Sequence, residues 1–116
     1  MTKIAIVGSR NFSDLKEVDK YLTLYKFINK DFKIITGGAI GVDKQAEKWA
    51  FDNKIKCKII RPINSKNKIN YLFRNIEIIT MSDIVCVFWD GKSKGTKFVI
   101  DYCNSRYKEL IVYTLK

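Results

Sequence analysis

Five short runs rich in isoleucine and valine recur along this chain and constrain its fold more than any other feature. The runs cover residues 3–7, 33–36, 56–60, 84–88 and 109–113. Their hydrophobicity is continuous rather than alternating, which is typical of strands covered on both faces, as in a parallel sheet. We therefore predict about five parallel strands.

Helical patterns fill the intervals between these runs. In the first, the apolar positions recur every three or four residues: Leu15, Val18, Leu22, Tyr25 and Ile28. Asp14 followed by Glu17 predicts a capping box at its start. Further helices are expected over about 41–53, over about 68–81 and from about 95. Their predicted inward positions are Ala46, Trp49 and Ala50, then Ile69, Leu72, Phe73, Ile76 and Ile79, then Val99, Tyr102 and Cys103.

The alternation of strands and helices predicts a single doubly wound α/β domain over residues 1–116, with helices on both faces of the sheet. A chain of 116 residues is the usual size of one domain. The first strand begins at the N-terminus and no apolar run reaches the roughly 18 residues of a membrane span. We expect a soluble, cytoplasmic protein with no membrane partner, in the host cytoplasm if it is phage-encoded.

Cys57, Cys86 and Cys103 lie in or beside apolar runs, and the chain has no histidine. We expect these thiols to be buried and reduced. Without histidine, we predict neither a metal site nor Ser-His or Cys-His catalysis. No cofactor is expected, and Mg²⁺ would have to arrive with ligand phosphates.

The net charge is +10. Such a surplus favours anionic ligands or nucleic acid. One basic stretch contains no acid, and its members are Lys54, Lys56, Lys58, Arg61, Lys66 and Lys68. A solvated lysine-rich surface and a functional patch both explain this stretch.

Three predicted strands end in a glycine-containing loop that leads into a helix. Because the carboxyl ends of parallel strands meet at one edge of the sheet, these loops are expected to form a single site for a phosphorylated ligand. In the first loop Gly8 permits a tight turn, while Ser9 and Arg10 offer a hydroxyl and a guanidinium. Arg10 binds phosphate or pairs with a surface acid; the sequence leaves both open.

The second loop contains Gly37, Gly38 and Gly41, which permit close approach to the backbone. Asp43 follows in the first helical turn, where it complements the helix dipole or accepts a ribose hydroxyl. The loop is not a P-loop, because Val42 and Asp43 replace the Lys-Ser/Thr pair.

The third loop, residues 89–96, combines hydroxyls, glycines and lysines at a helix start, which predicts an anion site or a plain N-cap. Its candidate ligand-binding residues are Trp89, Gly91, Ser93, Gly95 and Thr96. Trp89 is placed either to stack on a base or to cover the end of the sheet.

Together with Arg74-Asn75, these loops resemble the SLOG superfamily, specifically its short YspA/YpsA-related branch. The resemblance implies a Rossmann-like, nucleotide-binding and often oligomeric protein, and it adds Arg74 and Asn75 to the ligand site. It also implies that Arg74 would be catalytic if the chain were a phosphoribohydrolase. The matching glutamate after Gly95-Thr96 is missing, and the first carboxylate, Asp101, lies two positions too far along the helix and is expected to point away.

The favoured function is binding, without catalysis, of a phosphorylated nucleoside or a nucleotide-derived signal of the ADP-ribose or cyclic nucleotide type. The protein would then be a sensor or a sponge in nucleotide signalling, including phage anti-defence. The alternatives are an N-glycosidase acting on nucleoside monophosphates and a single-stranded nucleic-acid binder. A homo-oligomer is also predicted, because Tyr21, Phe27, Phe51 and Tyr107 fall off the inward stripes.

Overall fold

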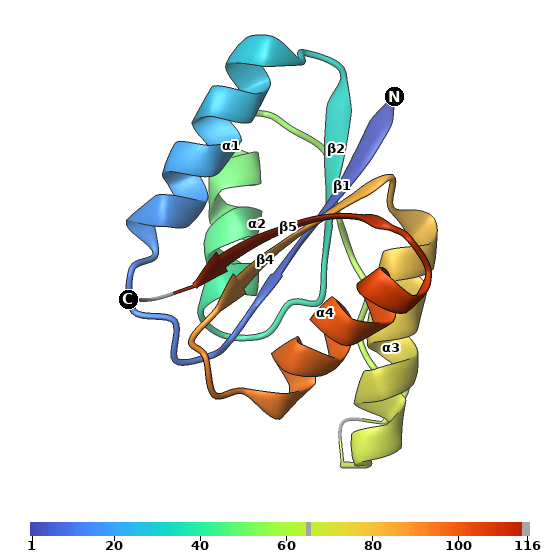
Figure 1. Ribbon diagram of the computed structural model, residues 1–116. Helices are drawn as coiled ribbons and strands as arrows, with labels where there is room; N and C mark the ends of the chain where they lie inside the picture. Colours follow the sequence, from blue (N-terminus) through green and yellow to red (C-terminus); the bar gives the residue numbers. More distant parts are fainter. Residues whose placement is uncertain (65, 115–116) are drawn as a thin grey trace.

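The computed structural model describes residues 1–64 and 66–114, which form a five-stranded parallel sheet flanked by four helices (Figure 1). The strands are β1 (Thr2–Gly8), β2 (Phe32–Thr36), β3 (Cys57–Ile59), β4 (Ile84–Trp89) and β5 (Glu109–Thr114). The helices are α1 (Lys16–Ile28), α2 (Val42–Asp52), α3 (Lys68–Met81) and α4 (Lys94–Ser105). The predicted doubly wound, Rossmann-like α/β fold is confirmed.

The strand order is β3-β2-β1-β4-β5, so the chain reverses its direction across the sheet at β1. Ile4 of β1 pairs with Ile34 on one side and with Ile84 on the other. Helices α1 and α2 pack on one face, and α3 and α4 pack on the opposite face. The carboxyl ends of β1 and β4 therefore form the switch point at which ligands bind in open α/β sheets.

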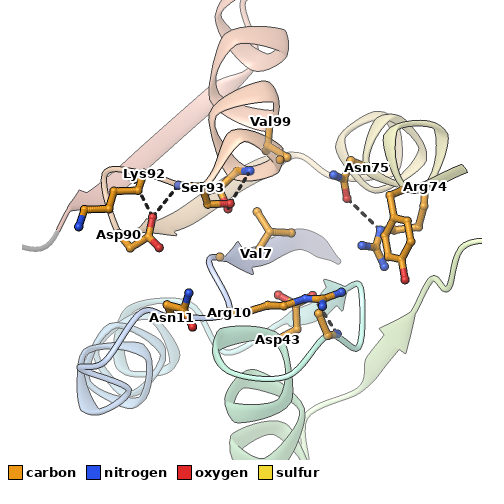
Figure 2. A pocket seen from close by; sticks show the side chains of 15 residues that line it. Val7, Arg10, Asn11, Asp43, Arg74, Asn75, Asp90, Lys92, Ser93 and Val99 are labelled. Carbon is orange, nitrogen blue, oxygen red and sulfur yellow. Dashed lines mark hydrogen bonds between the residues drawn. The ribbon is translucent and has the colours of Figure 1, made fainter. Parts of the chain in front are cut away.

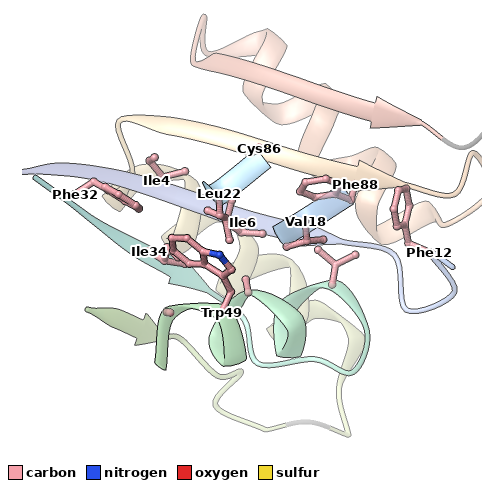
Figure 3. Close-up of a cluster of buried hydrophobic side chains, with 13 residues drawn as sticks. Ile4, Ile6, Phe12, Val18, Leu22, Phe32, Ile34, Trp49, Cys86 and Phe88 are labelled. Atoms are coloured by element: carbon pink, nitrogen blue, oxygen red, sulfur yellow. The ribbon is translucent and has the colours of Figure 1, made fainter. Parts of the chain in front are cut away.

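The core has one layer on each side of the sheet. On the α1–α2 side, Phe88 is fully buried, with its ring centroid 5.6 Å from that of Phe12 and 5.0 Å from that of Tyr113 (Figure 3). Burying a side chain of this size stabilises a fold by about 1.5–3 kcal/mol. The central strands are apolar on both faces because each face is covered by helices.

The thiols behave as expected for a packed interior. Cys86 and Cys103 are buried and Cys57 is half-buried. Burial raises the pKa of Cys57 and of Cys103 to about 11, so both remain protonated at neutral pH.

The predicted start of the first helix was wrong in detail. Its N-cap is Leu15, which makes no side-chain capping bond. Glu17 N donates to the backbone carbonyl of Asp14 (3.1 Å), so a turn of the chain replaces the capping box. At the other end Ile28 is 83% exposed rather than inward.

The predicted inward stripe of α3 was also wrong in its first half. Ile69, Leu72 and Phe73 are exposed, whereas Arg74 and Ile78 are buried. The helix begins beyond the carboxyl ends of the strands, so its first turns have no sheet beneath them (Figure 1).

The four candidate oligomer residues divide into two groups. Tyr21 is half-buried and packs edge-on against Phe88 in the α1–α2 core layer, so it was wrongly assigned to the surface. Phe27, Phe51 and Tyr107 are 84%, 85% and 96% exposed, and the homo-oligomer stays a prediction. Among the described residues, no helix has the length and hydropathy needed to cross a membrane.

Candidate functional site

A cavity of about 500 Å³ opens at the switch point, and we call it the β1–β4 pocket (Figure 2). It brings together eight predicted site residues: Gly8, Arg10, Asp43, Arg74, Asn75, Ser93, Gly95 and Thr96. The rest of its lining is Val7, Asn11, Ala39, Tyr71, Asp90, Lys92 and Val99. Figure 2 shows Arg10 and Asp43 on one side of Val7, with the third loop and Asn75 on other sides.

Hydroxyl groups join the first loop to the third. The buried Ser9 Oγ donates to Thr96 Oγ1 (3.2 Å) and accepts a hydrogen bond from Asp90 N (3.1 Å). Thr96 Oγ1 in turn lies 3.1 Å from Ser93 Oγ. Ser9, predicted to contact the ligand, therefore lies outside the lining and holds two loops together.

The third loop is ordered by its own polar groups. Asp90 Oδ1 accepts hydrogen bonds from Lys92 N (2.9 Å) and Ser93 N (2.8 Å), and these bonds lower the pKa of Asp90. Trp89 Nε1 donates to Ser93 O (3.0 Å) while its ring packs on the α3–α4 core layer. Trp89 and Gly91, two of the predicted ligand-binding residues, lie outside the pocket lining.

Arg74 ties the second loop to the end of β3 and to α3. Its Nη1 donates to Gly37 O (2.8 Å) and Ile60 O (3.3 Å), and its Nε donates to Asn75 Oδ1 (2.9 Å). A Cβ atom at Gly37 would lie 2.6 Å from Arg74 Nη1, so any larger residue there would have to displace this guanidinium. Arg74 therefore donates three hydrogen bonds to groups of the protein, which leaves fewer donors for a ligand.

Asp43 is a buried carboxylate at the base of the pocket. It is 4% exposed, and its Oδ2 accepts a hydrogen bond from Ala39 N (3.3 Å). Its Oδ1 is buried without a hydrogen-bond partner among residues 1–64 and 66–114. Burial raises the pKa of Asp43 to about 6, although the Ala39 N–H and the charge of Arg74 oppose the shift. An unpaired buried acceptor costs about 1–3 kcal/mol.

A second cavity of about 500 Å³ adjoins the first, and we call it the arginine pocket. It shares Arg10, Ala39, Tyr71 and Arg74 with the β1–β4 pocket. Its other lining residues are Gly37, Gly38, Ile40, Arg61, Pro62 and Ile63. The predicted residues Gly37 and Gly38 thus line this pocket, while Gly41, the N-cap of α2, lines neither.

Sequence reasoning missed several lining residues. Tyr71 lies at core spacing on α3, yet it is half-buried and lines both pockets. Asn11, Asp90 and Lys92 lie next to predicted site residues in the sequence, and this adjacency could have indicated that they line the pocket. Arg61 was noticed only as part of a basic stretch.

A profile of the DNA recombination-mediator protein A family matches residues 1–61, more than half of the chain. The chain belongs to this family. The SLOG superfamily resemblance agrees with the assignment, and no curated protein sequence matches significantly.

Solved structures support the fold of this family member. DNA processing protein A from Streptococcus pneumoniae superposes with a TM-score of 0.84 at 19% identity, covering 97% of this chain and 50% of that protein. The Helicobacter pylori protein, whose structure concerns its single-stranded DNA binding mode, gives 0.77 at 23% identity and covers 99% and 66%. The protein TM1055 gives 0.74 at 17% identity and covers 95% and 72%. The chain thus spans half to two-thirds of the length of the two DNA processing proteins.

In this family member the first carboxylate after Gly95-Thr96, that of Asp101, does not line the β1–β4 pocket. Asp101 is exposed and pairs with Lys97 Nζ at 2.7 Å, so it points away from the β1–β4 pocket as expected. The carboxylates that line the pocket are Asp43 and Asp90.

Proposed function

We propose that this protein binds single-stranded nucleic acid and seats one nucleotide of the strand in the β1–β4 pocket. The observation that carries the proposal is the family match over residues 1–61, because that segment contains the first and second glycine loops at the base of the pocket. The Helicobacter pylori protein, described as a single-stranded DNA binder, shares this fold.

The charges around the pocket favour a phosphate-bearing ligand. Arg10 is exposed at the pocket and makes no ion pair within the described part of the chain. Lys92 and the first turn of α4 line the same pocket, and a helix start presents unpaired N–H groups to an anion. These groups and Arg10 favour a strand phosphate at this pocket.

Fluorescence anisotropy with a labelled thymidine 20-mer tests the proposal. We expect binding that weakens steeply as salt rises, because each neutralised phosphate of a single strand contributes about −0.7 to the slope of log K against log salt. Arg10→Ala should weaken binding about tenfold and reduce that slope.

Arg106→Ala is the matched control, since Arg106 is equally exposed but caps the end of α4 away from the pocket. Equal losses in both variants would mean that overall charge, rather than the pocket, holds the strand. Absence of binding to the 20-mer at low salt would contradict the proposal.

Asp43 favours a second candidate, the nucleotide-derived small molecule. Its carboxylate lines the β1–β4 pocket, where a negative charge disfavours phosphate and suits a hydrogen-bond donor such as a ribose hydroxyl or a base amino group. We would measure thermal shifts with nucleoside monophosphates, cyclic nucleotides and ADP-ribose compounds. A ligand at a hundred times its dissociation constant adds about 2.7 kcal/mol, which is several degrees here. Shifts with these compounds and no binding of the 20-mer would favour this candidate over the first.

Recovering each stabilising ligand by mass spectrometry separates binding from hydrolysis. We expect ligands to be returned intact, since Arg74 is tied to Gly37 and Asp101 points away. Release of free base would establish an N-glycosidase.

Membership of the YspA/YpsA-related branch and a single nucleotide-binding domain over residues 1–116 are part of the same proposal.

A further inference from the structure

The arginine pocket differs from its neighbour in its charges. Arg10, Arg61 and Arg74 all line it, and no acidic residue does so among the residues that the structure describes. The β1–β4 pocket also contains Arg10 and Arg74, but Asp43 and Asp90 line it too. The stronger excess of positive charge therefore lies in the arginine pocket.

The three guanidinium groups are close enough to affect one another. Burial lowers the pKa of Arg74 most, and the charges of Arg10 and Arg61 lower it further, against the opposing effects of Asp43 and Tyr71. A Cβ atom at Gly38 would lie 2.7 Å from Arg61 Nη1, so this guanidinium rests against the loop backbone.

Arg10 and Arg61 are both exposed, and neither takes part in an ion pair within residues 1–64 and 66–114. Like charges held together without a counter-ion raise the energy of the empty site. An anion bound between them would relieve this repulsion and form charge-assisted hydrogen bonds.

The two pockets adjoin. Arg10, Ala39, Tyr71 and Arg74 line both, so a ligand longer than one nucleotide can contact both pockets across these residues. The Arg74 guanidinium lies over one face of the Tyr71 ring, 5.3 Å from its centroid, so these two side chains lie together where the pockets meet. Beyond these shared residues, Ile40 and Ile63 are 66% and 99% exposed and present apolar surface where a second base would lie.

We propose that the arginine pocket is a second nucleotide subsite, so that consecutive nucleotides occupy the two pockets with their connecting phosphate at Arg10 and Arg61. This inference rests on the proposed function and specifies its ligand as a strand of at least two nucleotides. Arg61, the one arginine that lines only this pocket, becomes the residue that distinguishes a strand from a mononucleotide.

Titrations with thymidine monophosphate and the dinucleotide pTpT test this inference by calorimetry. For the unmodified protein, we expect the dinucleotide to bind at least tenfold more tightly than the monophosphate, because a charge-assisted contact and a second base are added. Arg61→Ala should remove most of this gain while leaving monophosphate affinity within about twofold. Its melting temperature should stay unchanged, because Arg61 is exposed and unpaired among the described residues.

Arg106→Ala again serves as the control and should keep the full gain. Equal affinities of the unmodified protein for the two ligands would overturn the second subsite, as would an Arg61→Ala variant that retains the gain. If the thymidine 20-mer still binds through Arg10 in that case, only this inference fails. If neither the 20-mer nor the dinucleotide binds, the proposed function fails with it.

Discussion

The second and third glycine loops look alike in the sequence and differ in space. Both follow a strand, both lead into a helix, and both reach the same edge of the sheet. A Cβ atom at Gly37 would collide with Arg74 Nη1 at 2.6 Å. Nothing lies within 4 Å of a Cβ atom built at Gly91 or Gly95. In the second loop the space beside Gly37 is filled by Arg74, and in the third loop the space beside Gly91 and Gly95 is empty.

The acidic residues of the two loops differ in the same way. Burial raises the pKa of Asp43, whereas backbone N–H groups of Lys92 and Ser93 lower the pKa of Asp90. The second loop is therefore packed against the rest of the protein, whereas the third loop is exposed and is held by hydrogen bonds to its own backbone. A glycine pattern alone does not distinguish these two roles.

Gly37→Ala is expected to have the largest effect. The new methyl group must displace Arg74, whose Nη1 also bonds the Gly37 carbonyl, so we expect a loss of about 3 kcal/mol or failure to fold. Urea unfolding followed by circular dichroism measures the change. An unfolding free energy within about 1 kcal/mol of the unmodified protein would show that Arg74 moves aside at little cost.

The pH dependence of stability should reveal the buried carboxylate. The pKa of Asp43 is about 6 in the folded protein and 3.8 in the unfolded chain, so the folded protein binds more protons between these values. Its contribution to stability therefore falls as pH rises from about 4 through 6, by about 2–3 kcal/mol in total.

Asp43→Asn removes this titration, so unfolding curves of the two proteins across that range isolate it. Asp90→Asn is the matched control: it keeps Asp43, and its stability should fall with pH as that of the unmodified protein does, because the lowered pKa of Asp90 keeps that group ionised throughout this range. If the difference between the unmodified protein and Asp43→Asn stays constant from pH 4 to 7, the carboxylate of Asp43 is not buried as described.

Arg74→Ala and Arg10→Ala should separate stability from binding. Arg74→Ala removes three hydrogen bonds, two of them to the Gly37 and Ile60 carbonyls, and should cost about 2 kcal/mol. Arg10→Ala should leave stability within about 0.5 kcal/mol, since Arg10 is exposed. Thermal unfolding of both variants beside the anisotropy titrations is the measurement. A stability loss in Arg10→Ala that equals the loss in Arg74→Ala would contradict the division of roles.

Gly95→Ala is expected to change the free energy of unfolding least, and in the opposite direction to Gly37→Ala. Gly95 is the second residue of α4 and has open space around it, so alanine should stabilise the protein by about 0.5–1 kcal/mol. The same methyl group projects at the β1–β4 pocket and should weaken binding of the thymidine 20-mer several-fold. Unchanged affinity would mean that the strand does not approach this turn of α4.

The strands were predictable because each one is a continuous apolar run. The runs at 84–88 and 109–113 differ by one residue from β4 and β5. Helix faces were less predictable, since periodicity shows which residues share a face but not how far the helix extends over the sheet. Ile69 and Phe73 repeat correctly and are nonetheless exposed, because α3 begins past the strand ends.

The candidate site was predictable from its loops and not from its helix. Gly8 ends β1, Asp43 lies in the first turn of α2, and Gly95 and Thr96 lie in the first turn of α4; the geometry of an open parallel sheet brings these ends together. Tyr71 and Arg61 carried no such signal, because their place depends on how the start of α3 and the segment after β3 lie against the second loop.

The amino-acid sequence by itself determined the α/β order, the edge of the sheet where the loops meet and the positive charge of the chain. These follow from hydrophobic periodicity, strand direction and composition, which are local or additive properties. Only the tertiary structure decided that Arg74 fills the space left by Gly37, that Asp43 keeps an unpaired oxygen and that three arginines share one pocket. Such facts depend on distances between residues far apart in the chain, and packing alone sets those distances.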